Sequence, residues 1–220
     1  MGMNINTGNS VRDNYQYKTI NTKGKQYQAA AKDNLSAVIV EEMMMSPEER
    51  YMYELFGGRE QIMKNKMQWY DSDGNKLNAP GGIAGMSMDG VSLQQVHQII
   101  SVPDEWKEMM FQETKRHYIQ ENGVSNGDTT KRSEVFEGYQ RSTSIENRLK
   151  GTWTLGQYEK AYKRAFYNAI KEANPEWELG KAFNSNILDK ISREDIDKSL
   201  VQAQGEYGMV LVSKGIDISI

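Results

Sequence analysis

The segment Leu155–Ala173 constrains the fold most, because its apolar residues recur at steps of three and four positions. A helix over these residues carries an almost unbroken apolar stripe, made of Leu155, Tyr158, Tyr162, Ala165, Phe166, Ala169 and Ile170. Thr154 stands where an N-cap is expected, and Asn174-Pro175 supplies the stop. Such a stripe must be buried, so the chain needs other elements to cover it.

Helix-start signals recur along the chain and predict a mainly α fold. Further helices are expected to begin at or just after Ala29, Ser46, Arg59, Ser92, Pro103, Ser133 and Ser192. The clearest start is Ser46-Pro47 with Glu49, which has the spacing of a capping box. The residues expected to be buried on that helix are Met52, Leu55 and Phe56. A strand competes with the first of these helices, because residues 38–40 are β-branched.

The end of the chain changes character and predicts a small β element. Met209–Val212 and Ile216–Ile220 are strand-like and are separated by Lys214-Gly215, which suits a hairpin turn. The segment Tyr15–Ile20 alternates in the same way and would pair with these strands. The predicted fold class is therefore mainly α, or α+β, with Leu200 and Ala203 still on the helix that follows Ser192.

Composition shifts suggest three regions within one domain. Residues 1–27 form a polar N-terminal arm rich in Asn, Thr, Gly, Lys and Gln. Residues 28–122 form a helical region with a long loop at 71–92, where glycines and Pro80 interrupt any regular element. Residues 132–220 form a second helical region ending in the hairpin, and 123–131 form the linker between the two.

Charge and composition exclude several classes of protein. The 27 Lys and Arg residues and 30 Asp and Glu residues are spread along the chain, which disfavours nucleic-acid binding. There is no cysteine for thiolate chemistry, and no apolar run approaches the ~18 residues of a membrane span. A cytoplasmic location is expected. Leaderless export is the alternative, since the Asn- and Thr-rich start lacks a signal sequence.

The segment Trp69–Asn75 resembles the start of a calcium loop, with oxygen-bearing side chains at Asp71, Asp73 and Asn75. The required glycine is displaced to Gly74, and Gly82 stands where the final acidic ligand belongs. A turn explains these residues better. The loop that follows is the expected binding region, and its proposed binding residues are Trp69, Tyr70, Asp71, Asp73 and Asn75.

Metal or acid–base chemistry has few candidates. Glu113 and His117 lie four residues apart on one helix face, and with Asp71 and Asp73 they are the only metal-ligand candidates. A packed or salt-bridged histidine is the simpler interpretation of both His117 and His97. Paired carboxylates such as Glu48-Glu49 fall in first helical turns, where they complement the helix dipole. No metal site and no cofactor is therefore predicted.

The run from Ser46 to Gly58, followed by Trp69–Asn75, resembles small uncharacterised bacterial proteins of unassigned activity. The resemblance implies no catalytic residues. The hypothesis is a non-enzymatic binding or structural protein acting through its surface, with a protein partner or self-association. The alternatives are an exported protein associated with flagella or secretion, and a metal-dependent hydrolase centred on loop 71–92.

Overall fold

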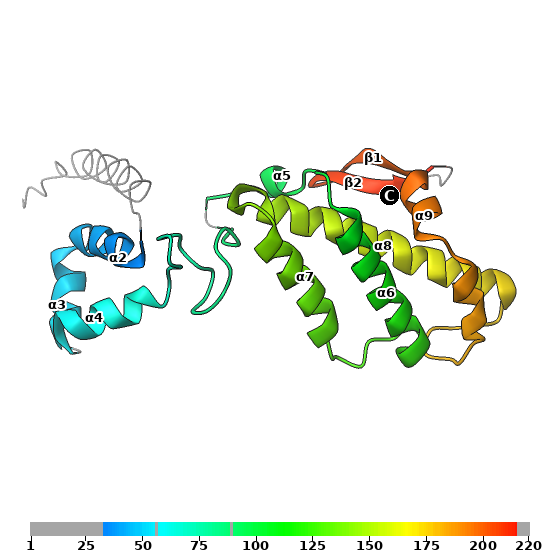
Figure 1. Ribbon diagram of the computed structural model, residues 1–220, viewed down its shortest axis with the longest axis horizontal. Helices are drawn as coiled ribbons and strands as arrows, with labels where there is room; N and C mark the ends of the chain where they lie inside the picture. The colour runs from blue at the N-terminus through cyan, green and yellow to red at the C-terminus, as the bar shows by residue number, and fades with distance from the viewer. Residues whose placement is uncertain (1–32, 56, 89, 215–220) are drawn as a thin grey trace, which may run out of the picture. The chain divides into compact units, whose positions relative to one another are not determined.

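The computed structural model describes residues 33–55, 57–88 and 90–214, and helices dominate them (Figure 1). The α-helices are α2 (Asn34–Met43), α3 (Pro47–Leu55), α4 (Gly58–Met67), α5 (Leu93–Val96), α6 (Asp104–Glu121), α7 (Thr130–Ser142), α8 (Arg148–Ala173) and α9 (Arg193–Ser199). Two 3-10 helices are η1 (Ile145–Asn147) and η2 (Ser185–Lys190). The strands β1 (Leu200–Gly205) and β2 (Gly208–Ser213) form an antiparallel pair. The predicted fold class, mainly α with a small β element, is confirmed.

The chain divides into two compact units, Met1–Ser87 and Met88–Ile220. The boundary falls inside the predicted loop 71–92 rather than in the predicted linker 123–131. The reason is that 123–131 only connects α6 to α7, which pack against each other within the second unit. The arm 1–27 lies outside the described residues, and the packing of the helical regions as one domain stays a prediction.

The first unit has a small core. Its members are Ala37, Val38 and Tyr70, with Met63 and Met67 packed against them. The β-branched run at Val38 lies in helix α2, because Asp33 caps this helix by accepting a hydrogen bond from the Ser36 N–H at 2.7 Å. Tertiary burial of Val38 thus outweighs its preference for a strand.

Helix α3 starts as predicted but buries nothing. Ser46 and Glu49 form the capping box, with N···O distances of 2.8 and 3.1 Å. The expected burial of Met52 and Leu55 is wrong, since their side chains are 51% and 59% exposed. They stay exposed because α3 packs mainly on α4, a contact that leaves Met52 at the edge of a groove. Phe56 lies outside the described residues.

The segment after α4 is irregular, as predicted for residues 71–92. Its described residues form turns and two isolated antiparallel bridges, Tyr70↔Lys76 and Leu77↔Ala84. Ser92 then caps α5 through a capping box with Gln95. The loop is therefore folded on itself by local pairing without becoming a sheet.

Helices α6, α7 and α8 pack against one another and form the centre of the second unit (Figure 1). The buried residues of this core are Val102, Met110, Phe111, Tyr118, Val135, Phe136, Tyr139, Leu155, Tyr162, Phe166, Ile170, Trp177 and Leu188. The stripe predicted on 155–173 supplies several of them, which confirms that it faces other helices. Helix α6 ends at Asn122 and Gly123, both with positive φ, as the sequence predicted.

Helix α8 begins at Arg148, so the expectation that Thr154 is its N-cap is wrong. Thr154 is fully buried inside the helix. Its hydroxyl donates to the carbonyl of Lys150 at 2.9 Å and accepts from the Ile100 N–H at 3.1 Å. The threonine thus holds the segment before α6 against α8 instead of starting a helix.

Two glycines explain why the first turns of α8 do not look helical in the sequence. Gly151 and Gly156 both lower helix propensity. Gly151 is required by packing, because a Cβ there would lie 2.2 Å from the buried Tyr139 hydroxyl. Gly151 therefore serves to let α7 and α8 approach each other closely, and not to make the helix flexible.

The hairpin that the structure describes joins the predicted strand Met209–Val212 to a segment predicted as helix. The predicted strand Met209–Val212 is part of β2, but β2 pairs with β1, from Leu200↔Ser213 to Gly205↔Gly208. Ser192 caps α9 as expected, yet α9 ends at Ser199, so Leu200 and Ala203 belong to a strand. The segment Ile216–Ile220 lies outside the described residues. Among those described, no helix combines the length and apolarity that crossing a membrane requires.

Candidate functional site

Asp71 organises a tight turn at the segment where the sequence placed a binding region. Its Oδ1 accepts hydrogen bonds from the backbone N–H groups of Asp73 at 3.0 Å and Asn75 at 2.8 Å. The Asn75 side-chain amide donates to both carboxylate oxygens, and Gly74 takes a positive φ of 76°. This is an Asx-type turn. Its carboxylate is engaged with N–H donors.

The two aromatic residues before this turn differ in environment. Tyr70 is buried, and its hydroxyl donates to Glu41 Oε2 at 2.8 Å, while Lys66 pairs with the same carboxylate at 2.8 Å. Burial and then the contact with Glu41 raise the pKa of Tyr70 well above its usual value. Tyr70 is therefore part of the core of the first unit. Trp69 is 38% exposed, and a binding role for this segment stays a prediction.

Glu113 and His117 do not form a joint ligand pair. Glu113 receives two hydrogen bonds from Arg116, at 2.7 and 2.6 Å. His117 Nε2 lies 3.6 Å from a carboxylate oxygen of Glu121, and its Nδ1 is buried without a partner in the described part of the chain. Both line a cavity of about 320 Å³ bounded by α6, α7 and α8. Across the described residues, no three His, Asp or Glu side chains are grouped as metal ligands.

The same cavity holds the most buried carboxylate of the second unit's charged network, Glu159 on α8. Arg132 donates to its two oxygens at 2.7 Å each, and Lys163 donates to one of them at 2.6 Å. Burial raises the pKa of Glu159, but the hydrogen bonds from Arg132 and Lys163 together outweigh it and leave the pKa lowered. A carboxylate held by two cations is a poor proton acceptor, so its role here is structural.

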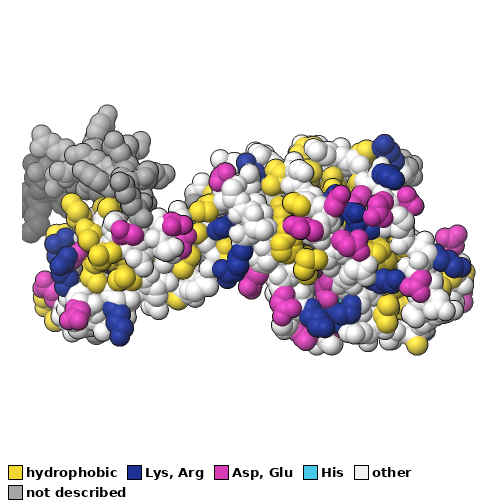
Figure 2. Space-filling model, viewed as in Figure 1, with side chains coloured by type: hydrophobic (Ala, Val, Ile, Leu, Met, Phe, Trp, Pro, Cys, Tyr) yellow, Lys and Arg dark blue, Asp and Glu magenta, His cyan; other side chains and the backbone are white. Residues whose placement is uncertain are grey.

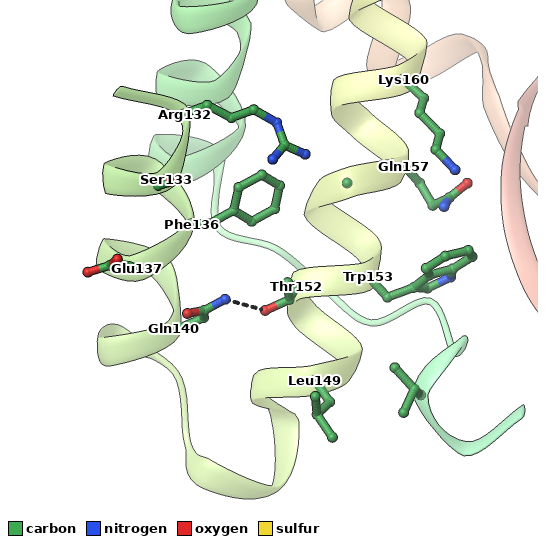
Figure 3. Close-up of a pocket in the computed structure, with 12 residues that line it drawn as sticks. Arg132, Ser133, Phe136, Glu137, Gln140, Leu149, Thr152, Trp153, Gln157 and Lys160 are labelled. Carbon is green, nitrogen blue, oxygen red and sulfur yellow. Dashed lines mark hydrogen bonds between the residues drawn. The ribbon is translucent and has the colours of Figure 1, made fainter. Parts of the chain in front are cut away.

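A second hollow, of about 460 Å³, lies on α8 beside α7 (Figure 3). Arg132 and Phe136 reach it from α7, and Trp153, Gln157 and Lys160 rise from α8 on the side away from α7 (Figure 3). Gly156 also lines it, and a Cβ added there would meet nothing within 4 Å. The missing side chain of Gly156 therefore leaves an open space between aromatic walls. We call this space the Gly156 hollow.

Trp153 is held in place at the edge of the Gly156 hollow. Its Nε1–H donates to the carbonyl of Met209 at 2.8 Å, and its ring stacks on His97 with centroids 3.6 Å apart. The backbone N–H of Met209 in turn donates to the carbonyl of His97 at 2.7 Å. The predicted packed state of His97 is seen here. A wall fixed by strand β2 and the α5 end is preorganised for contact.

Polar groups surround the apolar walls. The Lys160 ammonium lies 5.3 Å from the Trp153 ring centroid, and the Arg132 guanidinium lies 4.6 Å from the Phe136 ring centroid. The Gln157 side chain is almost fully buried, and its Nε2 has no hydrogen-bond partner in the described residues. The lining thus carries two cations, Arg132 and Lys160, one exposed carboxylate, Glu137 on α7, and the unsatisfied donor of Gln157.

A family model matches residues 20–220 of the chain, and its description is Domain of unknown function (DUF3879). The chain belongs to this family. No curated protein and no solved structure matches this DUF3879 chain. The family assignment agrees with the resemblance to uncharacterised proteins inferred from the sequence, and it adds no activity.

Sequence reasoning on this DUF3879 chain missed the Gly156 hollow. The predicted helix Leu155–Ala173 contains Gly156, but no role was assigned to this glycine. A usable signal is present, because a glycine in a strongly amphipathic helix lowers its stability and so implies a packing or functional reason. Trp153 escaped notice because it precedes the predicted start of the helix.

Proposed function

We propose that this protein is a non-enzymatic binding protein that docks a segment of a protein partner in the Gly156 hollow. The observation that carries the proposal is the open space above Gly156, flanked by Phe136 and Trp153. Aromatic side chains that line an open space are common acceptors for a buried anchor residue at a protein interface. An apolar or aromatic side chain of the partner fits this space.

The charged side chains around the Gly156 hollow indicate what kind of partner segment would bind there. Lys160 is exposed, and the Arg132 side chain remains 44% exposed although Glu159 holds it. These cations stand beside aromatic rings, where a partner carboxylate would gain from partial desolvation. The segment that fits best carries a large apolar side chain with acidic residues next to it.

The hydrolase alternative receives less support from the geometry. A metal-dependent reaction in loop 71–92 needs free oxygen ligands, whereas the Asp71 carboxylate is engaged by N–H donors of its own turn. The buried Glu159 is likewise neutralised by two cations. These carboxylates stabilise local structure, which favours a binding role over catalysis.

Phenylacetate is a suitable probe, because it joins an aromatic ring to one carboxylate. At about 0.3–0.4 kcal/mol for each of roughly ten non-hydrogen atoms, its affinity should be about 3–4 kcal/mol, a dissociation constant of a few millimolar or weaker. Titration into the ¹⁵N-labelled chain should shift the amide signal of Gly156 and the indole N–H signal of Trp153. Phenethylammonium, with the opposite charge, should shift them far less.

The matched variant is Gly156→Leu, which fills the space with a good helix former. It should fold normally and lose the phenylacetate shifts. Equal shifts from the anion and the cation, or phenylacetate shifts that persist in Gly156→Leu, would contradict the proposal.

A further inference from the structure

Helix α3 of the first unit presents an unusual exposed surface. None of its residues is buried. Tyr51 and Leu55, which lie one turn apart on the same face, are 61% and 59% exposed. Figure 2 shows hydrophobic side chains gathered on the surface of the α2–α4 unit. An amphipathic helix that keeps its apolar face in water is a candidate contact surface.

Acidic residues flank the apolar face of α3. Glu48 precedes Tyr51 by three positions and Glu54 follows it by three, so both lie on turns next to the tyrosine. Both glutamates are exposed. Glu49, by contrast, is used in the capping box. The helix therefore offers an aromatic and aliphatic anchor between two available carboxylates.

We infer that the partner segment of the Gly156 hollow is helix α3 of a second copy of this chain. The inference rests on the proposed function and names its ligand. Tyr51 would enter the space above Gly156 between the aromatic walls. Glu48 and Glu54 would meet the cationic rim formed by Arg132 and Lys160.

Charge and shape complementarity support this assignment. An acidic helix meets a cationic rim, and an exposed apolar face meets an open apolar hollow, so each surface supplies what the other lacks. Each copy carries one α3 and one Gly156 hollow. Where two copies exchange α3 reciprocally, the contact forms twice, and each contact raises the effective concentration for the other.

The first experiment measures dimerisation of the full chain by sedimentation velocity over a wide concentration range. The wild-type chain should form a dimer that weakens with salt, because the contact includes charge pairs. Tyr51→Ala/Leu55→Ala should raise the dimer dissociation constant at least tenfold. These residues are exposed, so circular dichroism should remain unchanged. Glu60→Lys, an exposed charge reversal on α4, is the matched control and should leave dimerisation intact.

A charge exchange tests the pairing itself. Glu48→Lys/Glu54→Lys should weaken the dimer, and adding Lys160→Glu to that variant should recover at least part of the loss. A Glu48→Lys/Glu54→Lys variant that dimerises as wild type does would overturn the inference.

Mixing two variants separates a contact between copies from one within a chain. Gly156→Leu has no open hollow, and Tyr51→Ala/Leu55→Ala has no anchor, so each should be monomeric alone. Their mixture retains one intact contact and should form a heterodimer detectable by fluorescence anisotropy of a labelled partner. A wild-type chain that stays monomeric, or a mixture that stays monomeric, would overturn the inference. Phenylacetate binding to a monomeric wild-type chain would leave the proposed function standing and remove only this ligand.

Discussion

The two glycines of α8 should respond in opposite directions to the same substitution. Gly156→Ala adds a methyl group that meets nothing within 4 Å, at a position with ordinary helical geometry. The unfolding free energy should rise by about 0.5–1 kcal/mol, the difference in helix propensity between the two residues. In a unit of this size that corresponds to an increase in Tm of about 3 °C.

Gly151→Ala gains the same propensity but collides with its neighbour. The new Cβ would lie 2.2 Å from the Tyr139 hydroxyl oxygen and 2.7 Å from its Cε1. Tyr139 is buried, and Trp106 packs on it edge-to-face at 6.0 Å, so the ring has little room to move. Overpacking costs about 1–3 kcal/mol, which exceeds the propensity gain. The net result should be a loss of about 1 kcal/mol.

Urea denaturation followed by Trp fluorescence and circular dichroism measures both changes. Tyr139→Phe removes the nearest colliding atom, so Gly151→Ala should be better tolerated in that background. A Gly156→Ala variant less stable than wild type would show that the space above Gly156 is not open. A Gly151→Ala variant as stable as wild type would refute the close approach of α7 to α8.

Three further predictions concern single side chains. Glu159→Gln should lower the unfolding free energy by about 1–2 kcal/mol, because Arg132 loses a buried charged partner. Folding lowers the pKa of Glu159, so the stability that this carboxylate contributes is present above the ordinary glutamate pKa of about 4.3 and is lost as pH falls through the folded-state pKa. Acid titration of Tm should show this loss in the wild-type chain, and a flat profile would contradict it. Asp71→Ala should cost about 1 kcal/mol by removing the turn acceptor, and millimolar calcium should leave the wild-type Tm unchanged; a calcium-dependent rise would favour a metal site. Trp153→Phe leaves the Met209 carbonyl without its donor and should speed amide exchange in β2, whereas unaltered exchange would show that the bond is dispensable.

Local signals in the sequence predicted the elements whose ends are capped by their own neighbours. The Ser46 capping box, the Ser92 and Ser192 caps and the stop at Asn122 all follow from residues within a few positions. The apolar stripe after Leu155 likewise needs only periodicity. These features depend on local backbone chemistry, which the sequence displays directly.

Features set by distant contacts were beyond such reasoning. The start of α8 was hidden because Gly151 reads as a helix breaker until Tyr139 is seen above it. The pairing of β1 with β2 was missed because Leu200 continues the apolar spacing of α9. The Gly156 hollow depends on where α7 places Phe136, which no local pattern reveals. In each case the deciding partner lies on another element.

The backbone hydrogen bond from Met209 to His97 has a consequence for how the second unit folds during synthesis. It closes a segment of about 110 residues, and closing a loop of that length costs about 4 kcal/mol of chain entropy. During synthesis, His97 and Trp153 leave the ribosome before β2 does, so the Trp153 indole lacks its hydrogen-bond acceptor on Met209 until β2 emerges. Only chains that include β2 therefore present the Gly156 hollow with Trp153 held in place.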